Sequence, residues 1–408
     1  MLFKKKKKSS KKAHIDRVSM HVISPYKLSE SMCRETTKQH QIYCVKFCPY
    51  TDEYIFAAAI LNKVEIFKIN DGDSMTKMRT FEAKKEEYFY ALSWTINKKT
   101  DEIVLIGGGM GGKIYNFIET SIFGVTMREK QNAINDIVFS PKIEYLFAAA
   151  YEDGSVCLYN LITESCIAIC QTQRSDSMKQ CISISFDPSG NYLAYGGMTN
   201  EIFIVNLKDC KDFQDNLKQS MTIKNKIDPV KLNLLHNMCV VQNLHTNFID
   251  SINWYAENSF ISKSADGDII FWELKGIDGQ VIPFKNVNGL KIVEQHISVI
   301  ENCNLWFIRF SLDPKLEYLT IGTCNGELYV CDLRNDSLFN CEYHILSNTF
   351  SQAAIRQSSF SNDGKYVVCS TDDSFLISYK RFDALDNNNN DIRVVKKKSK
   401  KSKKKTRK

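Results

Sequence analysis

Residues 105–117, "LIGGGMGGKIYNF", contain the G-x-x-x-x-G-K spacing of a phosphate-binding loop in Gly107, Gly112 and Lys113. In such a loop the next residue is Ser or Thr, because its hydroxyl holds a magnesium ion, but here it is Ile114. The loop must also start a helix whose amide groups bind phosphate. The following stretch, "KIYNFIETSIFGV", instead alternates and is rich in β-branched and aromatic residues, which is typical of a strand. We therefore interpret the stretch as a glycine-rich turn between two strands, and a phosphate-loop enzyme is disfavoured.

Histidine and cysteine, the other residues with catalytic potential, form no catalytic or metal-binding pattern. The 7 histidines are scattered, and none lies beside Cys or carboxylates at the spacing of a metal site or a triad. His245 is expected to have a structural role in a turn. The 14 cysteines include Cys44 with Cys48 and Cys166 with Cys170 but no C-x-x-C pair, which favours reduced, buried thiols in a nuclear or cytosolic protein. We expect no catalytic residue, no metal, no cofactor and no enzymatic activity.

The charge is divided unevenly along the chain. The net charge is +7, but residues 1–17 carry +7 and residues 391–408 carry +10, which leaves −10 for the rest. This pattern predicts an acidic globule with disordered basic tails at 1–17 and 384–408. The tails suit nuclear import or non-specific contact with nucleic acid phosphates, and solubilising tails without a partner are the alternative. The sequence has no apolar signal-peptide segment after its first lysines and no run long enough to cross a membrane.

One sequence phrase recurs seven times, most clearly as "NDIVFSPKIEYLFAAAYEDGSVCLYNL" at 135–161. Each copy contains an aromatic anchor, a small-residue strand, a polar turn and an alternating strand. The spacings between anchors are 47, 45, 47, 68, 56 and 50 residues, and the longer ones reflect insertions near 208–245 and 275–300. Four short strands repeated at this period predict an all-β, seven-bladed WD-repeat β-propeller over residues 18–383. The prediction rests on the period, because the Trp-Asp dipeptides are mostly eroded. The anchors are Phe47, Trp94, Phe139, Phe186, Trp254, Phe310 and Phe360.

The repeat pattern also assigns positions to two further segments. "MHVISPYKL", at residues 20–28, is strand-rich and is expected to supply the outer strand of the last blade, which removes a free sheet edge. "GGGMGG" stands where "YEDGS" and "SADGD" stand in the third and fifth copies, so it is expected to connect the second and third strands of blade two.

Propellers bind ligands at the rims of their central channel, so residues at equivalent positions of the innermost strands are the candidates for a binding site. The residues four before the anchors are Tyr43, Tyr90, Asn135, Ile182, Asp250, Trp306 and Arg356. Blades six, seven, one and two are consecutive in a closed ring, so Trp306, its neighbour Phe307, Tyr43 and Tyr90 should meet on one arc. Aromatic faces attract cations, and a trimethylated lysine, which has no N–H left, is a suitable ligand. The alternative is that these aromatics only pack between blades.

Several stretches resemble the embryonic ectoderm development/extra sex combs family. They are "LHTNFIDSINWYAENSFISKSADGDIIFWEL" (244–274), "NLWFIRFSLD" (304–313), "AAIRQSSFSNDGK" (353–365), "YFYALSWT" (88–95) and "NAINDIVFSP" (132–141). The resemblance covers roughly residues 35–383. It implies a nuclear, non-catalytic WD-repeat subunit of Polycomb repressive complex 2. Such a subunit binds trimethyl-lysine on the histone H3 tail at one end of the channel. Its other face holds the SET-domain methyltransferase subunit, which it stimulates in heterochromatin formation and transcriptional repression.

The resemblance also implies which residues act. The methyl-lysine cage falls on Tyr43, Tyr90, Trp306 and Phe307, and the peptide rim on Arg356, Asn135 and Asp250. Tyr43 stands where the family typically has Phe, and Phe307 where it has Tyr, so both positions keep an aromatic face. The segment at 208–245 is diverged, and the face for the methyltransferase cannot be matched residue by residue. A generic WD-repeat scaffold or substrate receptor without methyl-lysine reading is the alternative.

Overall fold

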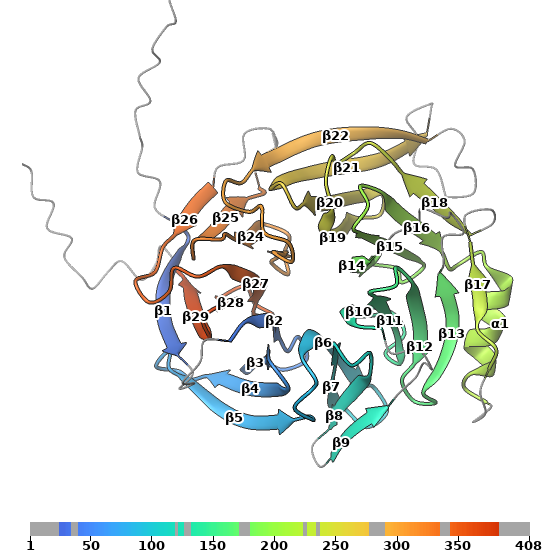
Figure 1. Ribbon diagram of the computed structural model, residues 1–408, viewed down its shortest axis with the longest axis horizontal. Coiled ribbons are helices and arrows are strands. Elements are labelled where there is room, and N and C mark those ends of the chain that lie inside the picture. Colours follow the sequence, from blue (N-terminus) through green and yellow to red (C-terminus); the bar gives the residue numbers. More distant parts are fainter. Residues whose placement is uncertain are drawn as a thin grey trace, which may run out of the picture.

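The computed structural model describes residues 24–33, 40–118, 121–125, 132–170, 180–222, 227–233, 237–276, 290–334 and 343–382. These residues form seven sheets arranged around a central axis (Figure 1). The prediction of a seven-bladed β-propeller is therefore confirmed. The predicted tails at 1–17 and 384–408 lie outside the described residues, as do parts of the insertions near 208–245 and 275–300.

Each blade is a meander whose first strand lies nearest the axis. Blade one comprises β2 (Ile42–Phe47), β3 (Tyr54–Ile60), β4 (Lys63–Ile69) and β5 (Met75–Glu82), and blade two β6 (Phe89–Asn97), β7 (Glu102–Gly109), β8 (Ile114–Ile118) and β9 (Ser121–Val125). Blade three comprises β10 (Ile134–Phe139), β11 (Leu146–Tyr151), β12 (Val156–Asn160), β13 (Ser165–Cys170) and β17 (Val230–Leu232), and blade four β14 (Cys181–Phe186), β15 (Tyr192–Gly197), β16 (Ile202–Asn206) and β18 (Met238–Val241). Blade five comprises β19 (Ile249–Ala256), β20 (Ser259–Ser264), β21 (Asp268–Gly276) and β22 (Leu290–Val299), and blade six β23 (Phe310–Leu312), β24 (Tyr318–Gly322), β25 (Leu328–Asp332) and β26 (Tyr343–Leu346). Blade seven comprises β27 (Ile355–Phe360), β28 (Tyr366–Thr371), β29 (Phe375–Arg381) and β1 (Tyr26–Cys33).

The innermost strands of six blades contain a β-bulge at the same place. In β2, Ile42 pairs with Ile60 and Cys44 pairs with Ala59, so Tyr43 is the extra residue. The same shift in register occurs in β6, β10, β14, β19 and β27. A bulge breaks the alternation of side chains and redirects one of them. The bulged residue is in every case the one four before the anchor, so the bulge redirects the equivalent side chain in each of these six blades.

The hydrophobic core lies between neighbouring blades rather than in one central mass. Phe56 and Ala58 of blade one, for example, pack with Tyr366 and Val368 of blade seven. The second strands are rich in small residues, such as the fully buried Ala148–Ala150, which let adjacent sheets approach each other.

A buried polar network lies within blade five. The His245 ring is 2% exposed, and its two nitrogens lie within hydrogen-bond distance of the hydroxyls of Ser262 (2.7 Å) and Ser264 (3.1 Å). Both serines belong to β20, so the ring ties the segment before β19 to the second strand of the blade. His245 thus has the structural role that was expected.

The ring is closed by strands from the two ends of the chain. β1 pairs antiparallel with β29, from Tyr26 opposite Arg381 to Cys33 opposite Phe375. The Tyr26 hydroxyl also donates a hydrogen bond to the carbonyl of Gly364 (2.8 Å). The prediction of an N-terminal closing strand is confirmed, although the strand begins at Tyr26, later than the stretch at 20–28 indicated.

Part of the blade-four insertion folds back onto blade three. Helix α1 (Lys211–Gln219) buries Phe213 and Leu217, and β17 pairs in parallel with β13 and so extends the sheet outward (Figure 1). The insertion therefore covers an edge that would otherwise be open. None of the helical segments described is long and apolar enough to span a membrane.

The glycine-rich turn lies between β7 and β8, as predicted, and a strand rather than a helix follows it. A side chain at Gly109 would place its Cβ 1.7 Å from the carbonyl oxygen of Tyr88, so only glycine fits there. The amide of Met110 donates to that same carbonyl (2.9 Å). The turn thus packs against the start of β6 and leaves no phosphate-binding loop.

Candidate functional site

The four aromatic residues predicted to form a cage come together at one mouth of the channel. Tyr43 and Tyr90 occupy the bulges of β2 and β6. Trp306 and Phe307 lie in the segment just before β23, where Phe307 has a φ of +70°. A positive φ is uncommon for a bulky residue and indicates that its surroundings hold it in place. We refer to these four side chains as the aromatic mouth.

Ring contacts link the members of the aromatic mouth. Tyr43 meets Tyr90 with ring centroids 5.1 Å apart and meets Phe307 at 5.7 Å, both edge to face. Phe307 also contacts Tyr90 at 6.3 Å and Trp306 at 5.3 Å. These separations are those of favourable aromatic pairs. Within the described residues no ring contact joins Trp306 to either tyrosine, so Phe307 is the ring that links Trp306 to the two tyrosines.

A cavity of about 370 Å³ opens beside these rings. Besides the four aromatics it is lined by Met110, Ala133, Asn135, Glu152 and Gln180. Of these only Asn135 was expected at the site; Met110 is at the tip of the glycine-rich turn, and Glu152 occupies the corresponding turn of blade three. The turns between the second and third strands of blades two and three therefore contribute to the mouth. These turns occupy equivalent positions in the repeat, but equivalence among the innermost strands alone does not identify them.

Arg356 stabilises the aromatic mouth from behind. Its Nε and Nη2 each donate to a carboxylate oxygen of Asp372 (both 2.7 Å), and its Nη1 donates to the carbonyl of Trp306 (2.6 Å). Its guanidinium carbon also lies 5.9 Å from the centre of the Tyr43 ring. A bidentate arginine–carboxylate pair fixes geometry well, so Arg356 positions the backbone of Trp306 relative to Tyr43.

Arg309 supports Phe307 and crosses the channel. Its guanidinium carbon lies 4.4 Å from the centre of the Phe307 ring. Its Nη1 donates to Asp136 (3.0 Å), and its Nη2 donates to the carbonyls of Asn135 (2.7 Å) and Ile182 (2.6 Å). Arg309 thus ties blade six to blades three and four. The sequence contains it within "WFIRFS", but nothing in its spacing distinguished it.

The three residues expected at the peptide rim lie inside the structure. Asp250 is fully buried and pairs with the equally buried Lys263 (2.7 Å). Asn135 is 4% exposed and donates to the carbonyl of Cys181 (2.7 Å). The Arg356 side chain is 5% exposed. Each therefore engages protein groups and helps to hold the mouth, and only Asn135 of the three lines the cavity.

Burial also sets the ionisation of the groups around the mouth. It raises the pKa of Tyr43, against the opposing charge of Arg356, and it raises the pKa of Tyr90, with Tyr43 and the negative charges of Glu87 and Glu152 adding to the effect. The pKa of Asp250 is raised by burial, opposed by Lys263 and by a hydrogen bond from the backbone of Phe307. Both phenol rings are therefore uncharged near neutral pH, as cation binding on an aromatic face requires.

Other reactive groups are absent from the part of the chain that is described. No group of three or more His, Cys, Asp and Glu side chains there could hold a metal ion. The cysteines in these ranges are free thiols, and most are buried. Burial raises the pKa of Cys48 to about 11 and that of Cys303 to about 12, which makes both thiols poor nucleophiles.

The fold and this mouth together define a seven-bladed WD-repeat β-propeller with an aromatic pocket at one end of its channel. No model of a known protein family matches the chain. Individual proteins do: Polycomb protein esc of Drosophila virilis is 24% identical over 337 residues, covering 80% of this chain and 77% of that protein. The Polycomb group protein FIE1 of Oryza sativa is 25% identical over 361 residues, covering 87% and 92%. The chain is a homologue of the Polycomb esc and FIE proteins, so the resemblance drawn from the sequence is confirmed.

Solved structures agree on the fold. A chain from the Chaetomium thermophilum Polycomb repressive complex 2 superposes with a TM-score of 0.69 at 14% identity, covering 88% of this chain and 98% of that one. A chain of the same kind of complex in an autoinhibited state gives a TM-score of 0.73 at 15% identity, with the same coverage. The interpretation of the chain as a non-enzymatic propeller is consistent with these relationships.

Proposed function

We propose that this chain is the non-catalytic propeller subunit of a Polycomb-type histone methyltransferase complex in the nucleus. In this role it binds trimethyl-lysine on the histone H3 tail at the aromatic mouth and holds and stimulates the SET-domain catalytic subunit. The expected result is heterochromatin formation and transcriptional repression. The observation that carries the proposal is the convergence of Tyr43, Tyr90, Trp306 and Phe307 around one cavity.

The relatives support this choice of partner. Those named esc and FIE are Polycomb proteins, and the structural neighbours are chains of Polycomb repressive complex 2. One neighbour, with a TM-score of 0.71 at 13% identity, comes from a complex with trimethylated histone H3. The basic segments 1–17 and 391–408 would add non-specific contact with nucleic acid and suit nuclear import.

The geometry suggests how the methylammonium group is held. It enters between Trp306 on one side and Tyr43 and Tyr90 on the other, above Phe307. Each face contributes roughly 0.5–2 kcal/mol, depending on how far water is excluded. Arg356 and Arg309 lie behind Tyr43 and Phe307 and keep these rings in place while their open faces bind the cation.

The flanking peptide has a path on the other side of the tyrosines. A second hollow of about 590 Å³ shares Tyr43, Tyr90 and Met110 with the first and is also lined by His40 and Gln41. A disordered tail loses entropy when it binds, so the affinity should be micromolar, about −6 to −8 kcal/mol. Multivalent contact within a nucleosome-bound complex would raise it.

The deciding experiment is calorimetric titration of the full chain with histone H3 tail peptides that differ only in lysine methylation. We expect preference for the trimethylated form. Trp306→Ala should abolish that preference and leave the fold intact, because the Trp306 side chain is 44% exposed and its removal creates no cavity in the core.

Phe350→Ala is the matched control, since Phe350 is 48% exposed and lies outside the cavity lining. It should bind like the wild type. Equal binding of all methylation states, or equal losses in both variants, would contradict methyl-lysine reading and leave a generic propeller scaffold. Unfolding of Trp306→Ala would show that Trp306 is structural.

A further inference from the structure

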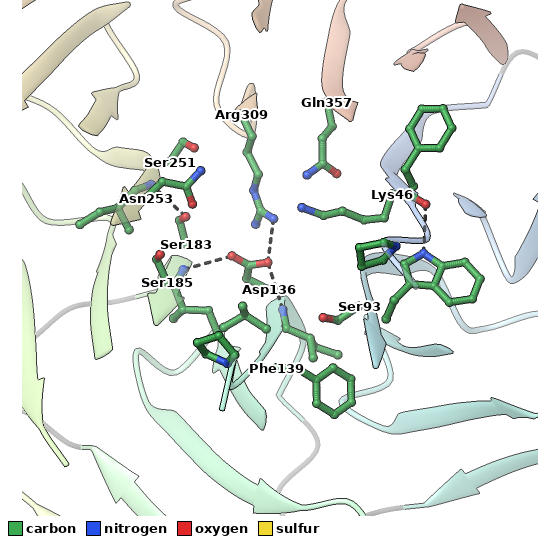
Figure 2. A pocket seen from close by; sticks show the side chains of 18 of the residues that line it. Lys46, Ser93, Asp136, Phe139, Ser183, Ser185, Ser251, Asn253, Arg309 and Gln357 are labelled. Carbon is green, nitrogen blue, oxygen red and sulfur yellow. Dashed lines mark hydrogen bonds and ion pairs between the residues drawn. The ribbon is translucent and has the colours of Figure 1, made fainter. Parts of the chain in front are cut away.

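A third cavity, of about 350 Å³, lies further along the channel from the aromatic mouth. Its polar lining comes from the innermost strands of most blades: Lys46, Ser93, Asp136, Ser183, Ser185, Ser251, Asn253, Arg309 and Gln357. Figure 2 shows Arg309 facing Asp136 at its centre, with Lys46 and Gln357 beside them. We refer to this cavity as the polar mouth. It shares no lining residue with the cavity at the aromatic mouth.

The polar mouth contains one carboxylate, and that carboxylate is already satisfied. Asp136 accepts hydrogen bonds from the amides of Ile137 (3.0 Å) and Ile184 (3.1 Å) and from Arg309 (3.0 Å). The charge of Arg309 is therefore offset by Asp136. The ammonium group of Lys46 has no carboxylate within 4.0 Å among the described residues, which leaves one net positive charge in the cavity lining.

Hydrogen-bond donors without a protein acceptor surround this charge. Gln357 uses its carbonyl oxygen to accept from the amide of Val45 (3.3 Å), which leaves its NH₂ group available. Ser183 and Ser185 accept from the amides of Ile252 and Trp254 (both 3.1 Å), and the Ser185 hydroxyl donates to the carbonyl of Phe186 (3.3 Å), so of these two only Ser183 has a hydroxyl without a protein acceptor among the described residues. In the described part of the chain, the side chains of Ser93, Ser251 and Asn253 make no protein hydrogen bond.

Arg309 is held by protein groups, so Lys46 carries the free charge of the cavity. The Arg309 side chain is 5% exposed, and its Nη groups donate to Asp136 and to the carbonyls of Asn135 and Ile182. The cavity therefore combines hydrogen-bond donors with one uncompensated positive charge. A ligand that suits it is a hydrogen-bond acceptor with a negative charge.

We infer that the polar mouth is a binding site for an oxyanion, either a carboxylate or a phosphate group. Lys46 supplies the charge, and the side-chain amides of Gln357 and Asn253 and the hydroxyls of Ser93 and Ser251 supply directed donors. Hydrogen bonds to an ionised acceptor are about twice as strong as neutral ones. The rim includes Pro49, Tyr50, Trp94 and Pro141, an apolar surround that limits competition from water. This inference does not depend on methyl-lysine reading at the aromatic mouth.

The test compares the full chain with Lys46→Met, which keeps an unbranched side chain one atom shorter and removes the charge. Inorganic phosphate and N-acetylglutamate are titrated by calorimetry at low salt. We expect binding to the wild type and a loss of affinity of about tenfold or more in Lys46→Met, because a charged hydrogen bond is removed. Phosphate binding alone would identify free phosphate as the source, whereas binding of both would point to an acidic group on a peptide.

Lys142→Met is the matched control, since Lys142 is an exposed lysine next to the rim residue Pro141 but outside the lining. It should bind both anions like the wild type. Equal affinity of wild type and Lys46→Met would place the anion elsewhere, for example on the basic terminal segments, and overturn the inference. Absence of binding to the wild type would also overturn it. Trimethyl-lysine binding should be unchanged in Lys46→Met, so failure of one proposal is separable from failure of the other.

Discussion

The aromatic mouth and the polar mouth are built on the same innermost strands and on the segment before β23, three residues apart. Tyr43 and Lys46 share β2, Tyr90 and Ser93 share β6, and Trp306 precedes Arg309 by the same interval. The bulged positions of blades one and two provide rings, whereas the positions three residues further on provide donors. One repeated strand can therefore present two chemistries along a single channel, because a bulge separates the residues of one layer from those of the next.

The largest effect is expected at Arg309, which touches both mouths. Arg309→Ala removes the ring contact behind Phe307, the ion-pair partner of Asp136 and the side-chain donor to the carbonyls of Asn135 and Ile182, and leaves Asp136 only the amides of Ile137 and Ile184. Removing one partner of a buried ion pair costs about 3–5 kcal/mol. We expect the free energy of unfolding, measured by urea denaturation, to fall by that amount.

Lys46→Ala is the contrast within the same cavity. Lys46 has no ion pair in the described residues, so its removal should change the free energy of unfolding by about 0.5 kcal/mol or less. Similar losses of unfolding free energy in Arg309→Ala and Lys46→Ala would show that Lys46 is as strongly paired as Arg309. The contrast between the two side chains would then disappear.

A smaller effect is expected at Glu152, the carboxylate at the edge of the aromatic mouth. Gln180 donates to it at 3.4 Å, and its charge contributes to the raised pKa of Tyr90. An exposed carboxylate attracts any basic peptide weakly. In Glu152→Gln, trimethylated and unmethylated H3 peptides should both bind roughly two- to fivefold more weakly in calorimetry. A change in the ratio between the two peptides would show that Glu152 contacts the methylammonium group itself.

The smallest effect concerns pH. Burial raises the pKa of Tyr43 and of Tyr90 above the ordinary value of 10.0, so both rings stay protonated well beyond neutrality. Trimethyl-lysine does not titrate. Affinity for a trimethylated peptide should therefore change less than about twofold between pH 6 and 9. A rise in affinity toward pH 9 in titrations across this range would indicate that one tyrosine ionises within it.

The repeat made much of this arrangement accessible from the sequence. The anchors Phe47 to Phe360 gave the blade number, and counting four residues back from each one selected the residues of the aromatic mouth. The counting worked because a bulge recurs at this position. The bulge itself could not be predicted, because the types of residue at these positions do not indicate where the alternation of side chains breaks. Trp306 is at the right interval without a bulge, since β23 begins only at Phe310.

What could not be predicted was the pairing of charges across the ring. Asp250 matched a rim position, yet its buried pairing with Lys263 depends on side-chain packing within blade five and beside Cys303. Arg309 meets Asp136, which is 173 residues away in the sequence. Contacts of this kind depend on how the ring closes, and periodicity alone carries no information about them.

The closing strand has a consequence for biosynthesis. β1 is the first described strand of the propeller to be made, and its partner β29, which ends at Arg381, is the last. Closure of the ring must therefore wait until the residues up to Arg381 have left the ribosome, and until then β1 has no sheet to join. During that interval a chaperone, or a subunit that assembles during translation, could act on the unpaired strand before the circle is complete.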